Sequence, residues 1–205
     1  MDAVRVALLR EVLAGTEWLG ATRRFAGALR GSVVSHGGGL LLVGTPAYEP
    51  WHLAAHLVDE AAWSGTPELT PTLVRHDARA ADPAHLAVGL GRLAAVRRGE
   101  TLLFVSPAEP DGPEGPDAAL LERVHDARLA GATVLALGSG GRELVAMAHE
   151  SLTVAKDAEL DLDSVQHLVS AAAGENGGCE RGRRRFRDRL SRLAEVLTAP
   201  PPAPW

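Results

Sequence analysis

The chain has 205 residues, a length that fits one large domain or one domain with appendages, and its composition, 46% hydrophobic and 23% charged, indicates a folded, soluble protein. Its apolar runs are much shorter than the ~18–20 residues of a membrane span, and its charged N-terminal segment lacks the apolar centre of a signal peptide. The single cysteine, Cys179, excludes an internal disulfide and a cysteine-based zinc site, so we expect a cytoplasmic protein.

Apolar runs of strand length alternate along the chain with segments of helical periodicity. The first segment, residues 2–30, has helical spacing with an expected break near Gly15 or Gly20, because glycine has a low helix propensity. Further helices are expected over residues 49–63, 84–97, 117–130, 142–149 and 161–173. Strands are expected near residues 40–44, 71–75, 101–106, 133–137 and 152–155. This alternation predicts an α/β domain over residues 1–173, a three-layer αβα sandwich with a five-stranded parallel sheet.

The C-terminal part of the chain differs from this domain in composition and charge. A Gly-rich linker is expected at residues 174–180, then a basic amphipathic helix at 181–197 and a Pro-rich tail at 198–205. Residues 180–205 carry seven arginines against three acidic residues, whereas the body of the chain is acidic. Because that acidic body opposes nucleic-acid binding, we expect the helix to dock by its apolar stripe. The abundance of Ala, Gly and Arg is typical of a GC-rich bacterial gene.

Three of the expected strands end in polar or glycine-containing segments. These are Gly44-Thr45, Ser106-Pro107 and Gly138-Ser139. Because the carboxyl ends of parallel strands share one edge of a sheet, and ligands bind at that edge, the three segments are candidates for ligand contact. Serines at such positions are also common as turn residues, which is the alternative interpretation.

Two histidines follow the first of these strands, on the helix expected over residues 49–63. His52 and His56 are four residues apart and therefore share one helix face. This spacing suits a divalent metal. The other interpretation is a histidine pair in a polar cleft or subunit interface without a metal.

Three segments resemble the SIS (sugar isomerase) domain, in its phosphoheptose isomerase-like branch, over roughly residues 15–172. GGGLLLVG followed by PWHLAAHLVDE is similar to the first strand of that family and its Q-H-F-A-A-E-L helix. GETLLFVS is similar to the G-D-x-L-I-x-I-S strand, and LAGATVLALGSGGRELVAMAHESLTV to the A-x-x-x-G-x-x-x-I-A-L-T-G-x-x-G-G-x-L-A-x-x-A-D segment. The resemblance implies an SIS-like fold and binding of a sugar or another carbohydrate derivative.

The resemblance also implies roles for individual residues. His52 falls on a family histidine, His56 on a glutamate that is a candidate for proton transfer, and His167 on the histidine of the R-I-Q-E-x-H helix. These three are the candidate catalytic residues, and phosphoheptose isomerases can hold zinc near this helix, so they are also the candidate metal ligands. The resemblance makes His167 the best third ligand, because in relatives its helix packs over the same cleft, and Gln166 is its alternative. The candidate ligand-binding residues are Gly44, Thr45, Ser106, Ser139 and Gly140. SIS relatives build sites between subunits, which implies a homodimer or homotetramer.

The chain departs from the family in its two phosphate-binding loops. G-N-G-G-S is replaced by GTPAY after Val43, and S-T-S-G-N-S by SPAEPD from Ser106. Pro107 and Pro110 lack N–H donors, and the acidic residues of this segment repel a phosphate. We therefore expect poor binding of phosphosugars and, as functions, a diverged isomerase-like enzyme or a non-catalytic SIS-like protein that acts through protein contacts.

Overall fold

The computed structural model describes residues 3–79, 81–108, 116–139 and 141–175. Its centre is a five-stranded, wholly parallel sheet, as the sequence predicts. The strand order in this sheet is β2-β1-β3-β4-β5. The strands are β1 (Leu40–Val43), β2 (Pro71–Val74), β3 (Thr101–Ser106), β4 (Thr133–Gly138) and β5 (Glu150–Leu152). The central strands β1 and β3 are buried along their whole length, which explains why their sequences are continuous apolar runs.

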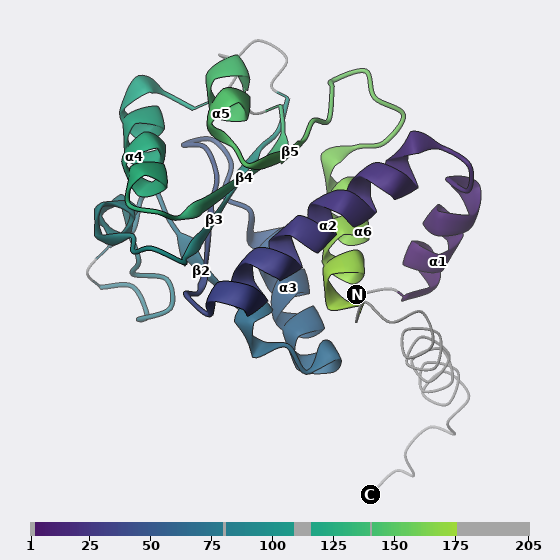
Figure 1. Cartoon of the computed structure of the whole chain (residues 1–205), viewed down its shortest axis with the longest axis horizontal. Helices are drawn as coiled ribbons and strands as arrows, with labels where there is room; N and C mark the ends of the chain where they lie inside the picture. The colour runs from purple at the N-terminus through teal and green to yellow at the C-terminus, as the bar shows by residue number, and fades with distance from the viewer. Residues whose placement is uncertain (1–2, 80, 109–115, 140, 176–205) are drawn as a thin grey trace, which may run out of the picture.

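Helices cover both faces of the sheet and complete three layers (Figure 1). The α-helices are α1 (Ala3–Val12), α2 (Glu17–His36), α3 (Trp51–Ser64), α4 (Ala118–Leu129), α5 (Gly141–Met147) and α6 (Leu162–Gly174), and two 3₁₀ segments are η1 (Pro67–Leu69) and η2 (Leu90–Ala95). Successive side chains of a strand point to opposite faces. Leu40 and Leu42 accordingly pack in one core with α2, α3 and α6, while Leu41 and Val43 pack in a second core with η2, α4 and α5.

The N-terminal segment confirms the predicted break and extends beyond the predicted end. Residues 13–16 separate α1 from α2, and Gly15 has a φ of 89°, a conformation that favours glycine. The second helix continues to His36, where Gly37 closes it in the left-handed conformation and donates its N–H to the carbonyl of Val33.

The prediction of a regular helix over residues 84–97 is wrong. Only the 3₁₀ segment η2 forms there, and Gly89 before it is extended and pairs with Arg75 as a parallel bridge. The leucines of this segment have helical spacing, but Gly89 and Gly91 weaken a helix, and the pairing with the end of β2 replaces it. The last strand also begins two residues earlier than predicted, because Glu150 already pairs with Leu135 of β4.

The last helix in the described residues is α6. Gly174, which the sequence places in the linker, is the last residue of this helix. A side chain there would meet the carboxylate of Glu60, since its Cβ would lie 1.9 Å from Glu60 Oε2, so helix packing accounts for this glycine. The rest of the predicted linker beyond residue 175, the basic helix at 181–197 and the tail at 198–205 lie outside the described residues. No helix in the described ranges has the length and apolar character of a membrane span.

Candidate metal centre

Two helices on the same face of the sheet position the three candidate histidines. Helix α3 follows β1 and α6 follows β5, so both begin at the carboxyl edge of the parallel sheet, and they pack against each other. Pro50 occupies the N-cap position of α3. Asp161 caps α6, where its carboxylate accepts the N–H of Ser164 at 2.6 Å. His52 lies in the first turn of α3, and His167 lies in the second turn of α6.

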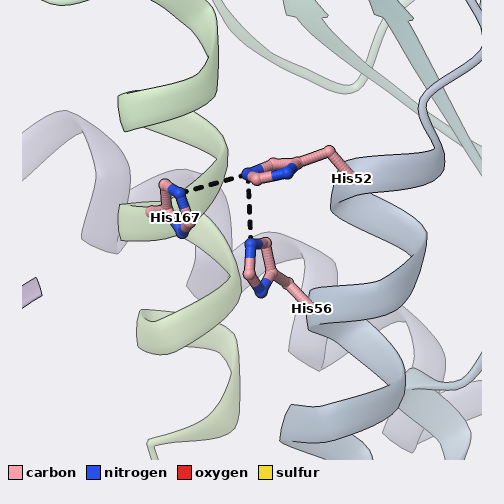
Figure 2. A group of neighbouring side chains, drawn as sticks. All are labelled: His52, His56 and His167. Atoms are coloured by element: carbon pink, nitrogen blue, oxygen red, sulfur yellow. Dashed lines mark hydrogen bonds between the residues drawn. The ribbon is translucent and has the colours of Figure 1, made fainter. Parts of the chain in front are cut away.

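The three imidazole rings converge across the contact between α3 and α6 (Figure 2). The Nε2 atom of His52 lies 3.1 Å from Nε2 of His56 and 3.1 Å from Nε2 of His167. All three ligand nitrogens lie within 4.8 Å of one another, and the ring centroids are 4.4–4.6 Å apart. This cluster, which we call the histidine cluster, can bind a metal ion.

Hydrogen bonding alone does not satisfy this arrangement well. A neutral imidazole nitrogen carries either one proton or one lone pair, so His52 Nε2 can form one directed hydrogen bond with one of its two neighbours. The other 3.1 Å contact of His52 Nε2 then brings together two N–H donors or two lone-pair acceptors, or it makes the same proton or lone pair serve both neighbours. A cation at the centre instead accepts a lone pair from each ring, and it resolves the conflict at all three nitrogens.

The spacing of the nitrogens also fits a tetrahedral metal. Two nitrogens bound to one zinc ion at ~2.0–2.1 Å with tetrahedral angles lie ~3.3 Å apart. The two contacts that His52 makes within the histidine cluster, both 3.1 Å, are close to this value. Three protein ligands leave a fourth position for water or substrate, as in catalytic zinc sites. His52 is exposed, so this side of the cluster is accessible.

Burial keeps His56 in the neutral state that a metal requires. His56 and His167 are each 8% exposed. The pKa of His56 is lowered to about 4, first by burial and then by the neighbouring His167 and His52, while Asp59 opposes the shift. At neutral pH His56 is therefore uncharged, and its lone pair is available for a metal.

Gln166, the alternative third ligand, has a different role. Its amide nitrogen donates to the hydroxyl of Tyr48 at 3.0 Å and to Asp163 Oδ1 at 3.2 Å. The bond to Tyr48 connects α6 to the loop that follows β1, whereas Asp163 lies within α6 itself. Burial raises the pKa of Tyr48, so its hydroxyl stays protonated at neutral pH. The histidine, and not the glutamine, joins His52 and His56.

The loop after β1 is a tight turn. Thr45 and Tyr48 exchange two backbone hydrogen bonds, of 3.0 and 3.1 Å. Gly44 is buried beneath this turn, and a Cβ there would lie 1.9 Å from the carbonyl oxygen of Tyr48. The carbonyl of Gly44 accepts a hydrogen bond from the ring of His76 at 3.0 Å. Within the described residues the hydroxyl of Thr45 is buried and has no hydrogen-bond partner.

The structure brings the two candidate serines together at the ends of β3 and β4. Their Oγ atoms are 3.2 Å apart, and Ser139 Oγ donates to the carbonyl of Pro107 at 2.8 Å. The N–H of Ser139 donates to the carbonyl of Ser106 at 2.8 Å. In this structure both hydroxyls thus bond to each other and to the loop. The remaining candidate, Gly140, lies outside the described residues.

An arginine network at the same edge was missed by the sequence analysis. Arg75, directly after β2, forms ion pairs of 3.0 Å with both Glu49 and Asp82. Its guanidinium also lies 5.2 Å from the ring centroid of Trp51, the first residue of α3. The hydrogen bond to Glu49 is the main cause that raises the pKa of Arg75. The network ties β2 to the start of α3, next to His52. In the sequence, the only indication of this network was a charged residue shortly after each of two strands, Glu49 after β1 and Arg75 after β2.

Comparisons with known proteins assign this chain to no family. The sequence matches no protein-family profile and no curated protein. Solved structures that match this chain in part include a candidate phosphosugar isomerase from Silicibacter pomeroyi DSS-3, 16% identical with a TM-score of 0.49, and a candidate sugar-binding protein from Salmonella typhimurium LT2, 15% identical with a TM-score of 0.48. The matches cover 96% and 94% of this chain and 53% of each of the other chains, so this chain spans about half their length.

Proposed function

We propose that this chain is an SIS-type protein that binds a sugar or another carbohydrate derivative at the carboxyl edge of its sheet, with a zinc ion held by His52, His56 and His167. The observation that carries the proposal is the convergence of three imidazole nitrogens from two packed helices. The three sequence segments similar to the SIS domain, together with the five-stranded parallel sheet, support the assignment of the domain type.

The chain's own residues would divide the work at this site. A bound zinc ion supplies a Lewis acid that polarises a carbonyl or hydroxyl oxygen of a ligand. The buried His56 and His167 hold the site in place, and the exposed His52 lies where a sugar enters. If His56 holds the metal through Nε2, its other nitrogen is buried and cannot reach a substrate proton. The metal-holding role of His56 and the proton-transfer role implied by the family are therefore alternatives.

Metal content is the direct test of the histidine cluster. We expect protein purified without a histidine tag to contain about one equivalent of zinc, or to take it up after chelator treatment, by elemental analysis. Zinc at a hundred times its Kd stabilises the native state by about 2.7 kcal/mol, which a thermal-shift assay detects. The test variant is His52→Ala/His56→Ala, which removes two of the three proposed ligands. The matched control is His125→Ala, which removes a histidine from the exposed face of α4. Equal, near-zero metal in all three proteins would remove the proposal.

Ligand specificity is tested separately. The acidic segment after Ser106 and the engaged serine hydroxyls favour neutral sugars over phosphosugars at the carboxyl edge. Titration calorimetry with a panel of free sugars and their phosphates measures this preference. Low-micromolar binding of sedoheptulose 7-phosphate, sensitive to His52→Ala, would contradict it.

A second candidate function is that of a non-catalytic SIS-like protein which acts through protein contacts. The observation that favours it is that Ser106 and Ser139 bond to each other and to the carbonyl of Pro107. A thermal-shift screen distinguishes the two functions, because a carbohydrate that binds the native state raises the melting temperature. No shift with any sugar, with or without zinc, would favour the second function.

We further propose that the chain is a homodimer or homotetramer that associates through α3. The outer face of this helix exposes Trp51, Val58 and Trp63, at 42%, 46% and 47%. Trp51, Ala55, Val58 and Ala62 follow one another at helical spacing and form an uncharged stripe that can pack against its own copy. His52 lies beside this stripe, so association through it would place a second subunit near the histidine cluster.

A further inference from the structure

A cavity lies at the opposite edge of the sheet from the histidine cluster. Its volume is about 490 Å³, and it is lined by Gly38, Arg92, Ala95, Arg97, Arg98 and Glu100. These residues precede β1 and β3, which places the cavity at the amino edge of the parallel sheet. The volume is in the range of small-molecule sites, ~300–1,000 Å³. We call it the amino-edge cavity.

The charges of this cavity are unbalanced. Glu100 is its one acidic residue, and its carboxylate is already engaged: Arg92 donates to Oε1, and the backbone N–H of Arg97 donates to Oε2 at 2.6 Å. The pair of Arg92 and Glu100 is therefore neutral. The guanidinium groups of Arg97 and Arg98 have no ion pair within the described residues. Two positive charges remain uncompensated in a protein whose net charge is −5.

The backbone that carries the two arginines is held on both sides. Thr101 donates its N–H to the carbonyl of Gly39 at 2.9 Å, and Gly99 donates to the carbonyl of Gly131 at 3.2 Å. The stem of Arg98 packs over Gly131, where a Cβ would lie 2.9 Å from Arg98 Cγ. Gly38 approaches the neighbouring segment so closely that a Cβ would lie 2.3 Å from the carbonyl oxygen of Gly99. The arginines thus start from fixed positions at the mouth of the cavity.

We propose that the amino-edge cavity binds the phosphate group of a small molecule, through the guanidinium groups of Arg97 and Arg98. A guanidinium presents planar paired N–H donors that match the oxygens of a phosphate, and two uncompensated charges balance a phosphate of charge near −2. The partly buried ion pair of Glu100 with Arg92 lines the same cavity, and Ala95 offers an apolar wall for the rest of the ligand. This site is independent of the histidine cluster and of the proposed sugar site.

The test uses full-length, chelator-treated protein, with pyrophosphate as the probe in titration calorimetry at 50 and 200 mM NaCl. We expect saturable 1:1 binding that weakens with salt. The Arg97→Ala/Arg98→Ala variant should bind at least tenfold more weakly. The matched control is Arg23→Ala/Arg24→Ala, which removes the same charge from the exposed face of α2 and should bind as the unmodified protein does. Absence of saturable binding to the unmodified protein, or an equal loss in both variants, would overturn the proposal.

A second variant separates a shaped site from general charge attraction and guards against misfolding. Arg97→Lys/Arg98→Lys keeps both charges but loses the paired donors. We expect it to fold and to bind pyrophosphate several-fold more weakly than the unmodified protein. Unchanged affinity would show that charge alone attracts the anion and would overturn the assignment of a site. None of these arginines contacts the histidine cluster. The zinc content of every variant should therefore equal that of the unmodified protein, whether or not the proposed function is correct.

Discussion

Acidification of the metal-free protein should lower its stability through His56, which is the most strongly perturbed histidine described. Its pKa is lowered from 6.5 to about 4 in the folded chain. Between these values the unfolded chain binds a proton at His56 that the native chain does not. Stability is therefore complete above pH 6.5 and falls as the pH drops towards 4.

The size of this effect follows from the two pKa values. At pH 5 the unfolded imidazole is almost fully protonated, whereas the native one is about one-tenth protonated, and the difference costs the native state about 2 kcal/mol relative to pH 7. For a domain of this length, about 2 kcal/mol corresponds to a decrease in melting temperature of about 4–8 °C.

The assay compares thermal and urea unfolding at pH 7 and pH 5, with a chelator present, for the unmodified protein and His56→Gln. Other groups titrate in both proteins, so the difference between their pH dependences isolates His56. His125→Gln is the control, because this histidine is exposed on α4. We expect His56→Gln to lose about 2 kcal/mol less on acidification than the unmodified protein. Identical pH dependence in all three proteins would refute the reasoning about burial and neighbouring charge.

Three further predictions concern stability and assembly. Gly44→Ala should destabilise the protein by ~1–3 kcal/mol, because the added Cβ would meet the carbonyl of Tyr48. The control Gly27→Ala, where the added Cβ has open space, should be neutral or stabilising. Urea unfolding measures both variants, and equal effects would contradict the close approach at Gly44. Asp117→Ala should cost ~1 kcal/mol, since the carboxylate caps α4 by accepting the N–H of Leu120 at 2.8 Å; an unchanged urea midpoint would argue against the cap. Val58→Arg should leave the fold intact and reduce the mass measured by light scattering, and a monomeric unmodified protein at micromolar concentration would refute association through α3.

The core of the fold could be predicted because its strands are buried on both faces. In such strands most positions are apolar, and the runs at 40–43 and 102–105 stand out against the polar and glycine-rich segments that flank them. The segment at 84–97 could not be predicted in the same way. Its leucines repeat with helical spacing, but the extended conformation of Gly89 depends on pairing with Arg75, which the local pattern does not contain.

The candidate site could be predicted only in part. The spacing of His52 and His56 places both on one face of α3, and the resemblance adds His167. Their convergence depends on how α3 packs against α6, which helical periodicity does not specify. The network of Arg75 likewise depends on tertiary packing. Glu49 lies 26 positions from Arg75 in the sequence, and the two side chains meet only because β1 and β2 are neighbours in the sheet.

The separation of the histidines along the chain has a consequence for how the protein is made. His52 and His167 are 115 residues apart, and between them the chain forms every strand of the sheet except β1. During synthesis the first two histidines leave the ribosome long before the third, at ~5–20 residues per second. For several seconds the nascent chain therefore offers an ion only the two ligands of α3. The complete site forms when α6 docks against α3, so metal capture would report that docking step.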